Sequence, residues 1–130
     1  MIQRILTAFA VVVISVIPST GNTPGKHTVL LTWTNGVCST SGTCTTNVYR
    51  GTSAGVCSGT PTPLASLAVS GTGGNAGTYT DQNPPTGAVY YNVSNVDPAK
   101  GGESTCNGEV QVTVSPITTP TDSGLAGVVQ

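Results

Sequence analysis

Residues 88–96 read AVYYNVSNV, the longest stretch of alternating side chains in the chain. Because successive side chains of a strand point to opposite faces, Val89, Tyr91 and Val93 share one face. An apolar face opposite a more polar one is typical of a strand whose sheet packs one side against a core. This stretch therefore predicts an antiparallel β-sheet with Tyr91 and Val93 buried inside the protein.

Shorter runs of the same period flank this strand and are separated by Gly, Pro, Asn and Ser turn residues, which predicts an all-β fold. The expected strands cover residues 28–34, 45–50, 64–69, 78–81, 88–96 and 109–114. The positions expected in the core are Val29, Leu31, Trp33, Tyr49, Tyr91, Val93, Val110 and Val112.

The composition excludes several classes of protein. Of 130 residues, 17 are Gly and 9 are Pro, which disfavours an all-α fold. The net charge is −1 with four basic residues, so no basic surface for nucleic acid is expected. One His and five acidic residues do not supply a nucleophile, a base and an orienting group, and no metal-ligand cluster is evident. The expectation is a protein that is not an enzyme and has no cofactor, no catalytic residue and no metal site.

The four cysteines predict disulfides. No Cys-x-x-Cys pair is present, and a small chain with this cysteine content is typical of an oxidising, extracellular environment. Cys38 and Cys44 flank a short Ser/Thr/Gly loop, and closing it stabilises the fold by about 2.4 kcal/mol on the loop-entropy relation. Cys57 and Cys106 remain as the second pair, although four cysteines allow three connectivities.

The first 17 residues are strongly apolar, and two interpretations of them stay open. As a signal peptide they would be removed together with the residues up to about 21. As a strand, residues 8–17 would be retained and covered by protein on both faces, since both faces are apolar. The apolar run 5–17 would span about 20 Å as a helix, too short to cross a membrane.

The order of the motifs LLTW, NVYRG, TYTD, the tyrosine-bearing strand and NGEVQVTV resembles bacterial fibronectin type III or immunoglobulin-like domains over residues 27–115. The resemblance implies an antiparallel β-sandwich, with Trp33 and the Tyr90/Tyr91 pair in the core or at a tyrosine corner. It implies no ligand. Residues 21–27, GNTPGKH, are too polar to supply the family's first strand.

The absent first strand motivates a hypothesis of self-assembly. Residues 8–17 would complete the sheet of their own domain or that of a neighbour, with residues 18–26 as the linker. Donation to a neighbour would build a homopolymeric filament on a cell or virion surface. The interface would comprise Ala8, Val11, Val12, Val13, Ile14, Val16 and Ile17. The alternative is a secreted monomeric binding or adhesion module without residues 1–21.

Three further expectations concern the surface. Residues 116–130 are interpreted as a C-terminal tail. The candidate sites for a covalent glycan are Ser and Thr hydroxyls and Asn92, which opens an Asn-Val-Ser sequon. Asp81 and Asp97 are expected to cap turns, and an exposed ion pair of Arg50 with an acid would contribute about 0–1 kcal/mol.

Overall fold

A computed structural model describes residues 13–18, 27–106 and 108–116, and these residues are almost entirely β-structure. The elements, in chain order, are β1 Val13–Pro18, β2 His27–Thr34, β3 Thr45–Gly51, β4 Ala65–Ala68, β5 Ala76–Asp81, β6 Gly87–Asp97, the short 3₁₀ helix η1 Pro98–Lys100, β7 Gly102–Glu103 and β8 Val110–Val114. The six strands expected from alternation are all present, with ends shifted by at most two residues.

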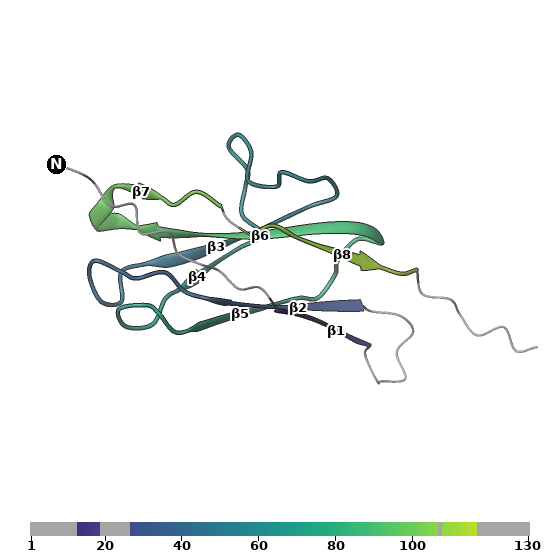
Figure 1. Cartoon of the computed structure of the whole chain (residues 1–130), viewed down its shortest axis with the longest axis horizontal. Helices are drawn as coiled ribbons and strands as arrows, with labels where there is room; N and C mark the ends of the chain where they lie inside the picture. Colours follow the sequence, from purple (N-terminus) through teal and green to yellow (C-terminus); the bar gives the residue numbers. More distant parts are fainter. Residues whose placement is uncertain (1–12, 19–26, 107, 117–130) are drawn as a thin grey trace, which may run out of the picture.

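The strands form two antiparallel sheets that lie as two layers (Figure 1). One sheet has the order β1-β2-β5, and the other has the order β4-β3-β6. The free side of β6 pairs with β7 at one end and with β8 at the other. β6 is therefore the central strand of the larger sheet, as expected for the longest alternating stretch.

The larger apolar cluster of the described residues lies between the two sheets. It takes alternate residues from β2, β3, β6 and β8, which is why the period of two in the sequence located most of it. Its buried members are Val29, Leu31, Trp33, Val48, Val89, Tyr91, Val93, Val112 and Val114. Two expected core positions are not in it. Tyr49 is buried on the opposite face of its sheet, because Val48 takes the inward position, and Val110 is only half-buried at the start of β8.

Trp33 is fixed at the edge of this core by hydrogen bonds and by a glycine. Its Nε1 donates to Asn35 Oδ1 at 2.7 Å, and Thr46 Oγ1 donates to the same oxygen at 2.9 Å. Its register partner on β5 is Gly77, where a Cβ atom would come within 2.3 Å of the indole nitrogen. The indole therefore packs directly on the backbone of β5.

β1, from the apolar N-terminal segment, is an edge strand of the smaller sheet. It pairs antiparallel with β2 from Val13↔Thr32 to Pro18↔His27. The pairing lies within the same chain, which is one of the two arrangements left open by the sequence. Residues 8–12 of the expected strand lie outside the described part of the chain.

An ion pair connects the two sheets, and it is less exposed than the sequence suggested. Arg50 Nη1 of β3 donates to both carboxylate oxygens of Asp81 on β5, at 3.0 and 2.8 Å. Tyr91 Oη of β6 donates to Asp81 Oδ2 at 2.7 Å. The Asp81 side chain is 4% exposed and that of Arg50 is 28% exposed. Asp81 also accepts from the Asn83 N–H, so it caps the following turn as expected.

Candidate functional site

Polar side chains gather on the outer face of the larger sheet. Because Val48 points into the core, its neighbours Asn47 and Tyr49 lie on the other face of β3. The register of β3 and β6 places Ser94 opposite Asn47. Glu103 of β7, opposite Val96 at the end of β6, reaches this group. Four polar residues from three strands therefore meet on one face.

The Glu103 carboxylate is held by this group through one of its oxygens. Oε1 accepts hydrogen bonds from Tyr49 Oη and Ser94 Oγ, and from Asn47 Nδ2 at 3.0 Å. Asn47 is itself positioned by Ser66 Oγ, which donates to its Oδ1 at 2.6 Å. The second carboxylate oxygen, Oε2, has no hydrogen-bond partner among the described residues.

These contacts shift two pKa values in opposite directions. Burial, followed by the hydrogen bond to Glu103, raises the pKa of Tyr49. Burial of the Glu103 carboxyl acts to raise its pKa, but the hydrogen bonds from Ser94, Tyr49 and Asn47 outweigh burial and lower it. Tyr49 is therefore the proton donor and Glu103 the ionised acceptor at neutral pH.

The connection between β3 and β4 covers this face (Figure 1). It is fastened by the disulfide Cys57–Cys106, with 6.2 Å between the Cα atoms. Glu109 fastens it a second time, because its carboxylate accepts from the N–H groups of Gly55 and Val56 at 2.9–3.0 Å. Under this cover Tyr49 is only 4% exposed.

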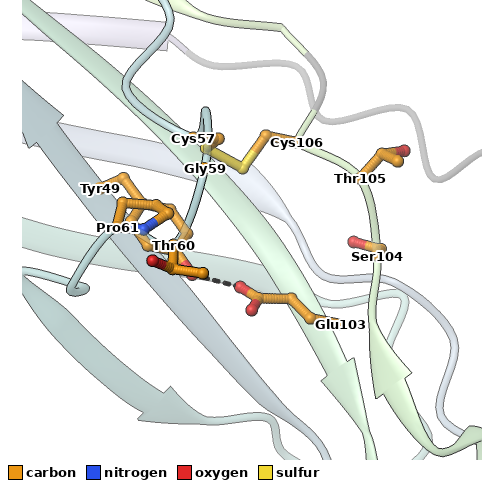
Figure 2. A pocket seen from close by; sticks show the side chains of 9 residues that line it. All are labelled: Tyr49, Cys57, Gly59, Thr60, Pro61, Glu103, Ser104, Thr105 and Cys106. Carbon is orange, nitrogen blue, oxygen red and sulfur yellow. Dashed lines mark hydrogen bonds between the residues drawn. A yellow bond between two sulfur atoms is a disulfide. The ribbon is translucent and has the colours of Figure 1, made fainter.

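A pocket of about 410 Å³ opens between the cover and the segment that follows β7. In Figure 2 the disulfide closes one end, Thr60 and Pro61 lie on one side, and Glu103 points across toward Tyr49. Ser104 and Thr105 line the other side. The lining consists of Tyr49, Cys57, Gly59, Thr60, Pro61, Glu103, Ser104, Thr105 and Cys106. The pocket thus combines one ionised carboxylate, several hydroxyl groups, a proline ring and a disulfide.

The sequence located the cysteine pairs but missed this pocket. Cys38–Cys44 and Cys57–Cys106 are the pairs expected, with Cα–Cα distances of 5.9 and 6.2 Å. The pairing of Cys57 with Cys106 indicated part of the pocket, because the disulfide brings residues 57–61 next to residues 103–106. The role of Glu103 had no sequence signal, since the two-residue strand β7 is too short to alternate.

Other expected site residues lie elsewhere. Val13, Ile14, Val16 and Ile17 belong to β1, whereas Ala8, Val11 and Val12 lie outside the described residues. Asn92 is 6% exposed, and its Oδ1 accepts from the Val93 N–H. The folded domain therefore offers no access to the Asn92 side chain, which argues against a glycan there.

Three properties of the described residues concern the redox environment, the membrane and metal ions. The two cysteine pairs favour an oxidising, extracellular environment. Within residues 13–18, 27–106 and 108–116, no helix has the length and apolar character needed to cross a membrane. The same residues contain no group of three or more His, Cys, Asp and Glu side chains placed to hold a metal ion. Compared with protein-family models, curated proteins and solved structures, the chain has no significant match.

Proposed function

We propose that this chain is a non-enzymatic extracellular structural protein whose copies assemble by exchanging β1. Each copy would be a β-sandwich of the fibronectin type III or immunoglobulin-like type. Its β1 would pair with β2 of the next copy in place of its own β2, forming a filament or an appendage on a cell or virion surface. The observation that carries the proposal is the placement of β1 as a terminal edge strand.

The strand order supports the sandwich type. In immunoglobulin-type sandwiches the first, second and fifth strands share one sheet, and the third, sixth and last strands share the other. Here β1, β2 and β5 form one sheet, and β3, β6 and β8 lie in the other. β4 departs from the constant-domain pattern, because it pairs with β3 rather than with β5.

The position of β1 supports exchange. It pairs with β2 and with no other described strand, and residues 19–26 alone connect the two. These eight residues reach about 28 Å when extended, far enough to place β1 on a neighbouring copy. The register partners of Ile14 and Val16 are Leu31 and Val29, which are almost fully buried. Without β1 the edge of β2 beside these core residues would be unpaired, so a copy gains from accepting a strand.

Exchange of this kind is head-to-tail. Each copy donates β1 at one surface and accepts a strand at another, so the contact is heterologous. A heterologous contact propagates into an open filament unless its rotation closes a ring. The low net charge of −1 is compatible with close packing, because repulsion between copies is small.

Cross-linking between two singly substituted chains tests the proposal. Ser15 of β1 is the register partner of Leu30 of β2. We would co-refold the Ser15→Cys and Leu30→Cys variants at equal concentration, oxidise them mildly and resolve the products on non-reducing gels. Strand exchange predicts a covalent dimer that contains one chain of each variant, because only an exchanged β1 brings the two new cysteines together.

Two controls separate exchange from chance contact. Each variant refolded alone should give little dimer, and a Ser15→Cys/Thr34→Cys mixture, which is out of register, should give no more. A double variant Ser15→Cys/Leu30→Cys that yields monomers with an internal bond, together with no mixed dimer, would refute exchange. A native chain beginning near Asn22, read by intact mass, would instead favour the secreted monomeric module.

A further inference from the structure

The pocket beside Cys57–Cys106 contains a carboxylate, Glu103, that forms no ion pair with any described residue. Glu103 Oε1 is occupied by three donors, and all three are uncharged side chains. The pKa of Glu103 is shifted by burial and by these hydrogen bonds, and no positively charged side chain contributes to the shift. Among the described residues, Arg50 forms an ion pair with Asp81. The positive charge of Lys100 is one of the influences that lower the pKa of Asp97. Glu103 therefore presents an ionised group with one free oxygen at a pocket.

The site is rigid enough to select an occupant. Asn47, Tyr49 and Ser94 lie on paired strands and hold the carboxylate from one side. The cover that forms the opposite wall is fastened by the disulfide and by Glu109. A carboxylate held in this way loses little side-chain entropy when it accepts one more hydrogen bond.

The geometry of the free oxygen decides which cation fits. A guanidinium is recognised best by both oxygens of a carboxylate, and Oε1 is already occupied. Calcium takes six to eight oxygen ligands, often several carboxylates, whereas Glu103 is the single carboxylate in the lining. A primary ammonium is a compact charge with three donors, which matches one carboxylate oxygen and nearby hydroxyl groups.

The remaining residues of the lining can contact the alkyl chain that carries such an ammonium group. The Pro61 ring and the disulfide offer apolar contact, whereas Thr60, Ser104 and Thr105 carry hydroxyl groups. The methylene groups of lysine pack on apolar surface while its charged end stays with polar partners. The volume of about 410 Å³ lies within the range of small-ligand pockets.

We propose that this pocket binds a primary alkylammonium group, such as a lysine side chain, through Glu103 Oε2. The bound group would extend its methylene chain along Pro61 and the Cys57–Cys106 disulfide. This proposal does not depend on strand exchange, because the pocket lies on the larger sheet and β1 belongs to the other.

Amide chemical-shift titration of the full chain tests the proposal. The probes are n-butylammonium, which carries the head group alone, and Nα-acetyl-lysine N-methylamide, which carries it on a peptide unit. The matched probes are the corresponding norleucine and arginine derivatives. Both ammonium probes should shift the amides of Thr60, Ser104 and Thr105 with millimolar affinity, and the norleucine and arginine probes should bind at least about tenfold more weakly. If n-butylammonium binds and the blocked lysine does not, the natural occupant is a free amine rather than a protein side chain.

Two variants assign the binding to the free oxygen. Glu103→Gln keeps an oxygen that can accept from Asn47, Tyr49 and Ser94, so the fold should persist, and affinity for both ammonium probes should fall at least about tenfold. Asp97→Asn removes the same charge outside the lining, keeps an oxygen that can accept from the Ala99 N–H, and should leave affinity within about twofold. The proposal is overturned if no probe shifts these amides, if Glu103→Gln binds like the native chain, or if calcium produces the same shifts at lower concentration.

Discussion

Removal of the Cys57–Cys106 disulfide is expected to cost about 4 kcal/mol of folding free energy. The two cysteines are separated by 49 positions, and the loop-entropy relation gives about 4 kcal/mol for a loop of this size. The corresponding value for Cys38–Cys44, with a separation of 6, is about 2.4 kcal/mol. Cys57 and Cys106 are half-buried, so serine substitution adds little packing loss. The cover should remain docked in the variant, because Glu109 still accepts from Gly55 and Val56.

The assay is urea unfolding followed by the fluorescence of Trp33, the single tryptophan, which is 4% exposed. With a slope of about 1.5 kcal/mol per molar urea, the midpoint of Cys57→Ser/Cys106→Ser should fall by roughly 2–3 M. Each single variant opens the same loop and serves as the control, so all three should lose the same free energy. A loss below about 1 kcal/mol in the double variant, or unequal losses among the three, would refute the assignment to loop closure.

Three further predictions concern the core and its polar contacts. Asp81→Ala leaves Arg50 and Tyr91 without their hydrogen-bond acceptor and should lower the free energy of unfolding by about 3 kcal/mol, measured by urea titration. A loss of less than about 0.5 kcal/mol, roughly that of a surface substitution, would contradict a stabilising role of the ion pair. Gly77→Ala places a Cβ against the Trp33 indole and should lower the free energy of unfolding by about 1–3 kcal/mol. The matched control is Gly102→Ala, whose Cβ meets no atom within 4 Å, and its effect on the same free energy should be smaller. Burial and hydrogen bonds to carboxylates raise the pKa of both Tyr49 and Tyr91, so their contribution to stability is present below the unfolded tyrosine value of about 10 and is lost as pH rises above it. The urea midpoint should therefore fall between pH 9 and 11 as phenolate absorbance appears, and a constant midpoint over this range would contradict the prediction.

The sequence predicted the strands well because the alternation of apolar residues and the burial pattern have the same cause. In β6 the residues Val89, Tyr91 and Val93 all point inward, as their spacing of two requires. β1 was ambiguous because its residues are apolar at nearly every position, so alternation gave no information. In the structure, residues 13–18 pair with β2 as a strand.

The pocket was not predictable in the same way. Tyr49 was expected in the core because it is large and aromatic, but its position next to Val48 places it on the other face, where the cover buries it. Alternation along a strand indicates which side chains face the core, but it carries no signal for burial of the opposite face under a connecting segment. Glu103 reaches Tyr49 through β7, whose two residues carry no periodic pattern.

The Cys57–Cys106 link has a mechanical consequence for the folded chain. A protein pulled at its two ends lengthens by the contour of the segments that unravel, at about 3.4 Å for each residue. The 49 positions between these cysteines cannot be drawn out while the bond is intact. With the Cys57–Cys106 bond intact, the domain should therefore extend about 160 Å less before its chain is taut than it does with this one bond removed. More than a third of the chain is thus inextensible, and this portion includes β4, β5, β6 and β7.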